Sequence, residues 1–265
     1  MNVDDPYAHV MMDAVDQKVA DLHTYSMSDK TADLYAFDSR FTGKSSAFKV
    51  TYEGKTYQFE TRLAGRFNIY NTLGAIGAAL SEGISMETIA AAMKTFHSVP
   101  GRFELIDEGQ SFTVVVDYAH TPDGLEKILT TAQEITKGRI LAVFGCGGDR
   151  DKMKRPIMGR IAARYADVAI VTSDNPRTED PETIVKEVAA GVEEVKAEKP
   201  SLQVEVVVDR RSAIQKAISL AKGDDIVLIA GKGHEDYQIL KDKTIHFDDR
   251  EEARKALKES CAARF

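Results

Sequence analysis

The chain has 265 residues, a length that corresponds to one large domain or two ordinary ones. Its 35 Lys and Arg residues stand against 42 Asp and Glu residues. The resulting formal charge of −7 argues against a protein that coats DNA or an anionic membrane surface. With 43% hydrophobic and 29% charged residues, the composition is that of a globular chain. The longest apolar runs are about five residues, against the ~18 that a membrane span requires.

The N-terminal residues and the cysteines indicate where in the cell the protein is expected. The N-terminal residues 1–5 are acidic and lack the apolar stretch of a secretory signal. Cys146 and Cys261 are too few for a disulfide framework and have no metal-binding spacing. We therefore expect a cytoplasmic protein that binds neither nucleic acid nor a membrane and that carries no metal site in this chain.

The first hundred residues combine strand and helix patterns. Apolar residues alternate with polar ones over residues 48–52 and 57–59, and Glu53-Gly54-Lys55 joins the two segments, which predicts a β-hairpin. Apolar residues spaced four, three and four apart between Ile69 and Leu80 predict a helix. A second helix is predicted from Ser85, a plausible N-cap, through Phe96.

From residue 102 onward, strand and helix patterns alternate, which predicts an α/β fold with a parallel sheet covered on both faces. Five short apolar segments are its predicted strands: 112–116, 139–144, 167–172, 204–208 and 225–230. Helix starts are indicated by Thr121-Pro122, Pro156 and Pro181-Glu182. Because Pro and Gly interrupt the pattern at residues 97–101, we place a junction there, between domains 1–99 and 100–265.

A polar or glycine-rich cluster follows four of the predicted strands. The clusters are Asp117-Tyr118-Ala119-His120, the run from Gly145 to Asp151, Asp174-Asn175-Pro176-Arg177, and Gly231-Lys232-Gly233-His234-Glu235. Taken singly, each has a structural interpretation as a chain reversal, a turn, a helix cap or a solvated charge. Ligands bind outside the carboxyl ends of parallel strands. The coincidence of four clusters at that edge therefore favours one site for a zwitterion or a phosphate.

Two glycine patterns that suggest nucleotide binding do not meet the requirements of the known motifs. A P-loop needs a glycine five positions before its second glycine, and Asp38 and Lys49 stand there for the tripeptides at 43–45 and 54–56. The second tripeptide also lies in the predicted hairpin turn. The run at 145–148 is no dinucleotide fingerprint, because Arg150 occupies the place of its third glycine.

Six motifs, in order and at compatible spacing, resemble those of the Mur ligases, the enzymes that build the peptide of peptidoglycan precursors. They are Gly65-Arg66-Phe67-Asn68-Ile69-Tyr70-Asn71, Pro100–Glu104, Asp117–Asp123, Gly145–Arg155, Asp174–Thr178 and Gly231–Tyr237. Folylpolyglutamate and cyanophycin synthetases share the general architecture. We do not expect them to combine the run at 145–155 with the DNPR and GKGHE sequences.

The resemblance implies that residues 1–99 are the last part of a central ATPase domain. Residues 100–265 would then be a Rossmann-like domain that binds the incoming amino acid. The family's P-loop, carbamylated lysine, magnesium ligands and uridine-binding domain would all lie upstream of Met1. We therefore expect a truncated ATP-dependent ligase that is inactive alone, with its Mg²⁺ ligands in the missing part. We also expect it to be a monomer.

The same resemblance implies roles for individual residues. In this family ATP phosphorylates a carboxylate, here that of UDP-MurNAc-L-Ala-D-Glu, and the amino group of the next residue attacks the acyl phosphate. Asn71 would contact the adenine, Arg102 the phosphates and Asp117 the ribose, and His120 would lie near the phosphates as a catalytic residue. The amino acid would be bound by Arg150, Asp174, Asn175, Pro176, Arg177, Gly231 and Glu235.

The DNPR run favours meso-diaminopimelate as the amino acid, because lysine-adding relatives have a different pattern there. Diaminopimelate carries a carboxylate and an ammonium at its far end, where lysine has only an ammonium. The planar guanidinium of Arg177 offers two parallel N–H bonds to that carboxylate. Asn175 offers both a donor and an acceptor, Glu235 accepts from an ammonium, and Pro176 fixes the backbone of its neighbours.

Two other interpretations remain open at this stage. One is a non-catalytic module that captures an amino acid without turnover. The other is a different Rossmann-like nucleotide-binding protein, which the missing fingerprint disfavours.

Overall fold

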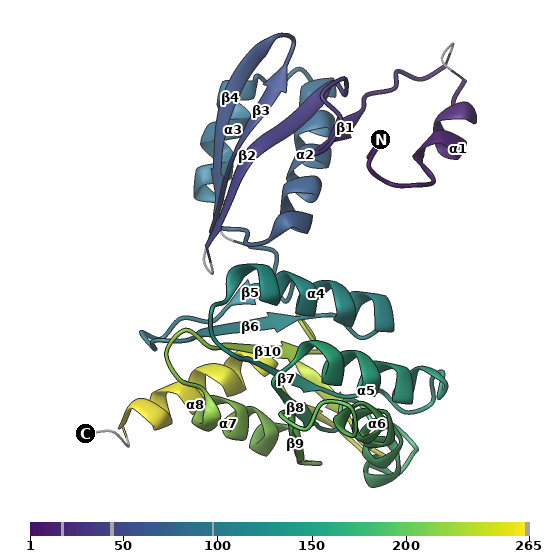
Figure 1. The fold of residues 1–265 in the computed structure, drawn as a ribbon, viewed down its shortest axis with the longest axis vertical. Helices are drawn as coiled ribbons and strands as arrows, with labels where there is room; N and C mark the ends of the chain where they lie inside the picture. Colours follow the sequence, from purple (N-terminus) through teal and green to yellow (C-terminus); the bar gives the residue numbers. More distant parts are fainter. Residues whose placement is uncertain (17–18, 43–44, 97, 263–265) are drawn as a thin grey trace. The chain divides into compact units, whose positions relative to one another are not determined.

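The computed structural model describes residues 1–16, 19–42, 45–96 and 98–262 (Figure 1). The chain divides into two compact units, Met1–Ser98 and Val99–Phe265. Part of the GK[ST] tripeptide at 43–45 and one residue of the predicted junction at 97–101 lie outside the described residues. Among the helices of the described residues, none has the length and hydropathy of a membrane span.

The first unit contains a four-stranded sheet with the order β1-β2-β3-β4. Its elements are α1 (Ala8–Asp13), β1 (Tyr25–Ser26), β2 (Leu34–Thr42), β3 (Ser45–Tyr52), β4 (Lys55–Thr61), α2 (Arg66–Ser81) and α3 (Met86–Thr95). Strand β1 runs parallel to β2, and the other pairs are antiparallel. Buried side chains of β2, β3 and β4 form one apolar core with those of α2 and α3.

The predicted hairpin and both predicted helices of this unit are confirmed. The hairpin turn places Glu53 at φ 47° and Gly54 at φ 73°, as a two-residue hairpin loop with left-handed central residues requires. Ser85 caps α3 by accepting a 3.3 Å hydrogen bond from the Thr88 N–H. Phe96, expected at the end of α3, lies one residue beyond the helix and has extended backbone angles.

The second unit contains a six-stranded sheet with the order β5-β6-β10-β7-β8-β9. Its strands are β5 (Glu104–Leu105), β6 (Thr113–Asp117), β7 (Ile140–Phe144), β8 (Val168–Val171), β9 (Gln203–Val206) and β10 (Ile226–Ala230). The five predicted strands are confirmed, and they are mutually parallel. The sheet also has an antiparallel edge strand, β5, which sequence patterning missed because it has only two residues.

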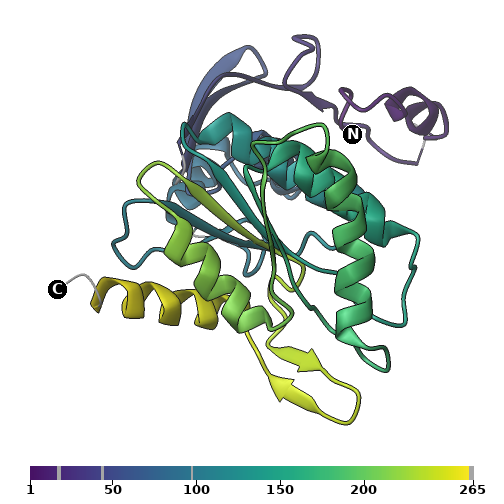
Figure 2. The same ribbon diagram turned by 60° about the horizontal axis from the view of Figure 1, so that its bottom comes forward.

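Helices cover both faces of this sheet, as predicted (Figures 1 and 2). They are α4 (Pro122–Ile135), α5 (Lys154–Tyr165) and α6 (Pro181–Lys196) on one face, and α7 (Arg210–Leu220) and α8 (Asp249–Ala262) on the other. Alternate strand residues such as Val114, Val143 and Ile229 pack into the core beneath α7 and α8. Their neighbours in each strand are also buried, which explains the continuous apolar runs.

The helix start signals are confirmed at two positions and displaced at the third. Thr121 caps α4 by accepting a 3.1 Å hydrogen bond from the Gly124 N–H. Pro181 is the first residue of α6. Pro156 lies in the first turn of α5, which begins two residues earlier at Lys154.

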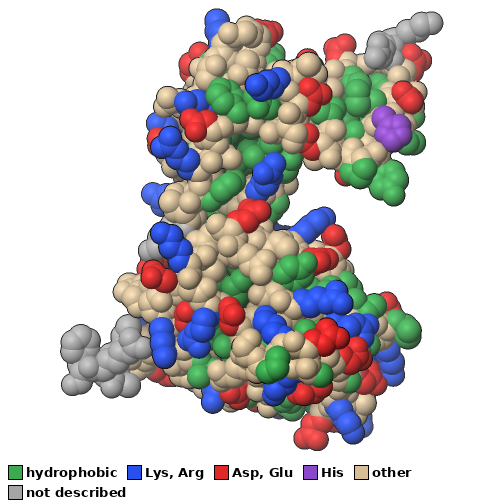
Figure 3. Space-filling view, viewed as in Figure 1, with side chains coloured by type: hydrophobic (Ala, Val, Ile, Leu, Met, Phe, Trp, Pro, Cys, Tyr) green, Lys and Arg blue, Asp and Glu red, His purple; other side chains and the backbone are tan. Residues whose placement is uncertain are grey.

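A short hairpin of β11 (Tyr237–Ile239) and β12 (Thr244–His246) follows β10 and is seen as two yellow arrows in Figure 2. It was not predicted, because three-residue strands of mixed polarity leave no clear periodicity. On the face drawn in Figure 3, acidic and basic side chains of the second unit are interspersed rather than gathered into a patch of one sign.

Candidate functional site

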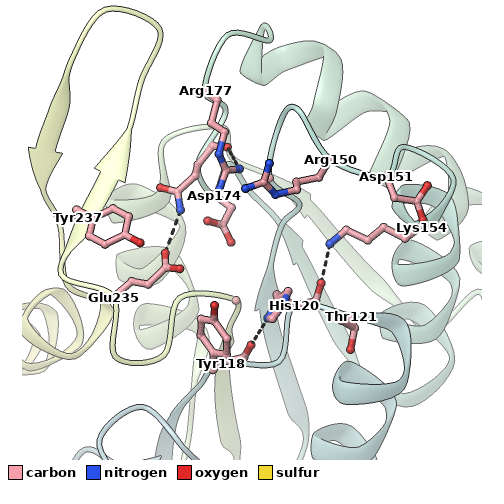
Figure 4. A pocket seen from close by; sticks show the side chains of 13 residues that line it. Tyr118, His120, Thr121, Arg150, Asp151, Lys154, Asp174, Arg177, Glu235 and Tyr237 are labelled. Carbon is pink, nitrogen blue, oxygen red and sulfur yellow. Dashed lines mark hydrogen bonds between the residues drawn. The ribbon is translucent and has the colours of Figure 1, made fainter.

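A pocket of about 430 Å³ lies at the carboxyl edge of the six-stranded sheet (Figure 4). Its walls come from the segments that follow β6, β7, β8 and β10, which are neighbouring strands. Seven of the predicted site residues line it: His120, Arg150, Asp174, Asn175, Arg177, Gly231 and Glu235. The four clusters meet because parallel strands bring their carboxyl ends to one edge.

Charges of both signs line this pocket. Figure 4 shows the guanidinium groups of Arg150 and Arg177 and the ammonium of Lys154 around one part of it. The carboxylate of Asp174 lies beneath the two arginines, that of Glu235 faces Tyr237, and that of Asp151 lies beside Lys154. An arrangement of this kind suits a ligand that carries both ammonium and carboxylate groups.

Arg177 is held against the glycine-rich loop that follows β7. Its Nη1 donates to the Gly148 carbonyl oxygen at 2.9 Å and to the Asn175 carbonyl oxygen at 3.4 Å. A Cβ at Gly147 would lie 2.8 Å from the same Nη1, so glycine leaves room for the guanidinium. Both side-chain hydrogen bonds found for Arg177 use Nη1. The residue itself stands in the left-handed region, at φ 53°.

Two glycines of the loop after β7 have a packing role. A Cβ at Gly148 would overlap the carbonyl oxygen of Pro176, and one at Gly145 would overlap that of Thr172. The close backbone contact between the two loops therefore requires glycine at both positions. Pro176, a predicted binding residue, makes this contact and does not line the pocket.

The unpredicted hairpin holds the DNPR run in place. Gln238 donates from Nε2 to the Asp174 carbonyl oxygen at 2.7 Å, and the Ile239 N–H donates to Asn175 Oδ1 at 2.9 Å. The Arg177 N–H in turn donates to the Ile239 carbonyl oxygen at 3.1 Å. Three hydrogen bonds thus fix the backbone and one side chain of the run.

Asn175 and Glu235, from different loops, meet in the wall of the pocket. Asn175 donates from Nδ2 to Glu235 Oε2 at 3.0 Å. The Glu235 carboxylate raises the pKa of the neighbouring Tyr237 phenol above its ordinary value, because ionisation of the phenol would add a second negative charge nearby. Tyr237, Tyr118 and Lys154 also line the pocket and were not among the predicted site residues.

Two of the residues predicted to bind ATP lie at the end of β6 and beside it. Asp117 Oδ2 accepts from the Phe103 N–H at 2.6 Å, and Oδ1 accepts from the Ala119 N–H at 2.7 Å. Burial raises the pKa of Asp117, although the two N–H groups oppose that rise. The guanidinium of Arg102 stacks over the Tyr118 ring, 4.6 Å from its centroid.

The other two predicted residues of the nucleotide and reaction site lie in different units. His120 packs its ring edge-on against Tyr118, and its Nδ1 lies 2.8 Å from the Tyr118 carbonyl oxygen. Asn71 is an exposed residue of α2 in the first unit and donates to Asn68 Oδ1 at 3.3 Å. The second unit therefore brings together Arg102, Asp117 and His120, whereas Asn71 belongs to the first.

A buried cation that was not predicted supports the loop carrying Arg150. Arg155 has no exposed side-chain surface and pairs with Glu179 at 2.8 Å and with Glu187 at 2.7 Å. Glu179 also accepts from the Asp149 N–H at 2.6 Å. The hydrogen bonds from Arg155 and Asp149 lower the pKa of Glu179 from 4.5 to about 2.

Within the part of the chain that the structure describes, no group of His, Cys, Asp and Glu residues is suited to hold a metal ion.

Fold and pocket define the second unit as an open α/β protein with its site at the carboxyl edge of the sheet. The family model described as "Mur ligase, glutamate ligase domain" matches residues 101–233, and the "Mur ligase middle domain" matches residues 1–79. The chain belongs to the Mur ligase family, which confirms the resemblance found in its motifs.

Several similar curated proteins are named UDP-N-acetylmuramoyl-L-alanyl-D-glutamate–2,6-diaminopimelate ligase. The protein of Clostridium botulinum is 47% identical over 262 residues, which are 98% of this chain and 52% of the relative. The protein of Geobacillus kaustophilus is 48% identical over 263 residues, 98% of this chain and 51% of the relative. The chain thus spans about half the length of the curated relatives it matches.

Solved structures share the fold. A ligase of the same name matches with a TM-score of 0.71 and 36% identity, over 98% of this chain and 53% of that one. A MurF ligase from Thermotoga maritima in complex with ADP matches with a TM-score of 0.63 at 12% identity, over 98% of this chain and 53% of that one. The second match shows a common fold only.

Proposed function

We propose that the whole protein is an ATP-dependent ligase that joins meso-diaminopimelate to UDP-MurNAc-L-Ala-D-Glu, and that the pocket of the second unit holds the diaminopimelate. The names of relatives at 47–48% identity support the reaction. The family models over 1–79 and 101–233 support a central-domain portion followed by an amino-acid-binding domain. The opposite charges in one pocket carry the proposal for the ligand.

In the proposed complex the two sides of the pocket bind different groups of the amino acid. Asp174 and Glu235 accept hydrogen bonds from an ammonium, whereas Arg177 and Arg150 donate to a carboxylate. Within the described residues, the side-chain hydrogen bonds of Arg177 use Nη1, which supports a second, parallel pair of N–H groups, Nε–H and Nη2–H, for the ligand. Lysine has no distal carboxylate to occupy them.

Two residues beside the pocket, Arg102 and Asp117, support binding of a nucleotide phosphate. Arg102 is held over Tyr118 and supplies a positive charge next to the pocket, and Asp117 holds the segment that carries Arg102 through the Phe103 N–H. ATP would supply the phosphoryl group that activates the acceptor carboxylate.

Calorimetric titration of the purified chain with meso-diaminopimelate and with L-lysine tests the proposed ligand. We expect diaminopimelate to bind at least ~10-fold more tightly, because the distal carboxylate adds a charge-assisted contact. L-lysine measures the contribution of the shared ammonium and α-carboxylate groups. Equal affinities for the two amino acids, or no binding of either, would contradict the proposal.

A further inference from the structure

A lysine lies buried behind the pocket wall, where no motif argument assigned it a role. Lys232 has no exposed side-chain surface. Its Nζ lies 3.0 Å from Asn175 Oδ1, 3.4 Å from Glu235 Oε2 and 3.6 Å from Asp174 Oδ1. These three side chains come from two loops, and all three line the pocket. One buried ammonium therefore links the polar groups on the acidic side of the site.

The ammonium determines which way the Asn175 amide faces. Asn175 Oδ1 accepts from Lys232 Nζ and from the Ile239 N–H, both of which can only donate. The amide nitrogen must then face Glu235, to whose Oε2 it donates at 3.0 Å. Within the described residues, the side-chain contacts found for Glu235 all use Oε2. Oε1 is thus the oxygen offered to a ligand.

The same ammonium compensates two carboxylates that share a wall. Asp174 and Glu235 both pair with Lys232, and without this cation the repulsion between the two carboxylates would favour protonation of one of them. A neutral carboxylic acid would no longer accept strongly from the ammonium of an amino acid. Arg210 also interacts electrostatically with Asp174 and Glu235, but its guanidinium is bound in a bidentate contact to Asp249 and does not take part in the hydrogen bonds of Lys232.

We propose that Lys232 is a positioning residue for the amino-acid ligand. It orients the Asn175 amide and keeps Asp174 and Glu235 ionised, so that the acidic side of the pocket is ready to accept an ammonium group. The ligand part of this proposal rests on the proposed function, whereas the charge compensation is a property of the protein alone.

Other ionisable groups face this cluster from the surrounding elements and are kept constant in the test. Among the described residues they include Arg210 and Asp249 of α7 and α8, Tyr237 of β11, Cys146, Asp236, and the pocket residues Tyr118, His120, Arg150, Asp151, Lys154 and Arg177. Burial raises the pKa of the Cys146 thiol to about 11, so this group stays neutral throughout the range used.

The first measurement needs no ligand. Lys232→Met keeps the approximate length of the side chain and removes its charge. Lys222→Met is the matched control, because Lys222 is an exposed lysine that precedes β10, whereas Lys232 follows it. In Lys232→Met, a carboxylate without its cation holds a proton more tightly in the folded than in the unfolded chain, so stability falls as pH rises. We expect the loss of Tm to be larger at about pH 8 than at about pH 5.5, by roughly 3–5 °C.

A second variant keeps this measurement informative where Lys232→Met folds poorly. Lys232→Met/Glu235→Gln also removes one of the two carboxylates, so Asp174 is the one negative charge of the pair that is left without its cation. We expect this double variant to recover most of the Tm lost at pH 8. A Tm deficit that is the same at both pH values and that the double variant does not reduce would overturn the proposal.

The second measurement uses meso-diaminopimelate in calorimetric titrations. We expect Lys232→Met to bind it roughly 10-fold or more weakly than the wild type at about pH 6. The deficit at about pH 8, where both carboxylates are ionised again, should be smaller. A merely distorted pocket would lose affinity equally at both pH values, and that outcome would overturn the role in binding. If the wild type itself does not bind, the proposed function fails, and the Tm measurement still decides the charge compensation.

Discussion

The two edges of the six-stranded sheet both carry arginine and aspartate, yet they use them differently. At the amino edge, Asp225 accepts from the Arg139 N–H at 2.8 Å, from Arg139 Nη2 at 2.7 Å and from the Lys222 N–H at 2.9 Å. Asp167 accepts there from the Ile140 N–H at 2.8 Å. At the carboxyl edge, Asp174, Arg177 and Glu235 of the DNPR and GKGHE loops line a pocket.

The difference shows that a charged residue at a strand end indicates a binding site only when it stands at the carboxyl end of a parallel strand. At the amino edge the carboxylates join neighbouring backbone segments, so they contribute to stability. At the carboxyl edge several charged side chains keep hydrogen-bonding capacity on the pocket side, as Arg177 and Glu235 do. Substitutions at the two edges should therefore change different measured quantities.

Arg177→Ala should have the largest effect on ligand binding. If the guanidinium pairs with the distal carboxylate, its loss costs about 2–4 kcal/mol, or roughly 30- to 1000-fold in affinity for meso-diaminopimelate. L-lysine, which lacks that carboxylate, should lose much less. Titration of both amino acids into wild type and variant gives the comparison, and equal losses for the two would mean that Arg177 is structural.

Asp225→Ala should show the opposite behaviour. It leaves the N–H groups of Arg139 and Lys222 without their acceptor and removes the partner of the Arg139 guanidinium. We expect a loss of about 2–3 kcal/mol in stability, seen as a Tm lower by roughly 4–10 °C. Affinity for meso-diaminopimelate should stay within about twofold of the wild type. A large loss of affinity would contradict the division between the edges.

Glu179 tests whether the carboxyl edge also contains a purely structural carboxylate. Hydrogen bonds, first from Arg155 and then from the Asp149 N–H, lower its pKa from 4.5 to about 2. A lowered pKa stabilises the folded chain above about pH 4.5, and this contribution is lost as pH falls towards about pH 2. The difference in Tm between wild type and Glu179→Gln should thus be present at neutral pH and shrink on acidification. A difference that does not change with pH would contradict this assignment.

Much of the fold was predictable because it depends on local patterns. The five parallel strands are short β-branched runs, and Thr121 and Ser85 are N-caps of the expected kind. The convergence of four loops followed from strand direction alone. The roles of the individual site residues stay predictions, because they come from a resemblance to the family and no bound ligand tests them.

The features that were missed depend on distant partners. Arg210 and Asp249 are both fully buried and 39 residues apart, and nothing in either local sequence distinguishes them from exposed charges. Lys232 is also buried, and two of its three partners, Asp174 and Asn175, lie in the distant loop after β8. The hairpin of β11 and β12 acts through hydrogen bonds to the DNPR run, which a hydropathy pattern does not record.

The smallest expected effects come from exchanging arginine for lysine once at each edge of the sheet. Arg139→Lys keeps the positive charge but loses the planar guanidinium whose Nη2 donates to the Leu220 carbonyl oxygen and to Asp225 Oδ2 at 2.8 and 2.7 Å. We expect a loss of about 1 kcal/mol in stability with unchanged affinity for meso-diaminopimelate.

Arg177→Lys also keeps the charge, but it loses the parallel N–H pair that the distal carboxylate would accept from. We expect roughly 10-fold weaker binding of meso-diaminopimelate and a Tm within about 2 °C of the wild type. Each variant is the control for the other, since both exchange the same two side chains in one unit. If Arg177→Lys lowered the Tm as much as Arg139→Lys and left affinity unchanged, the guanidinium at 177 would serve the Gly148 contact alone. The distal carboxylate would then have to be bound by another cation that lines the pocket, such as Arg150.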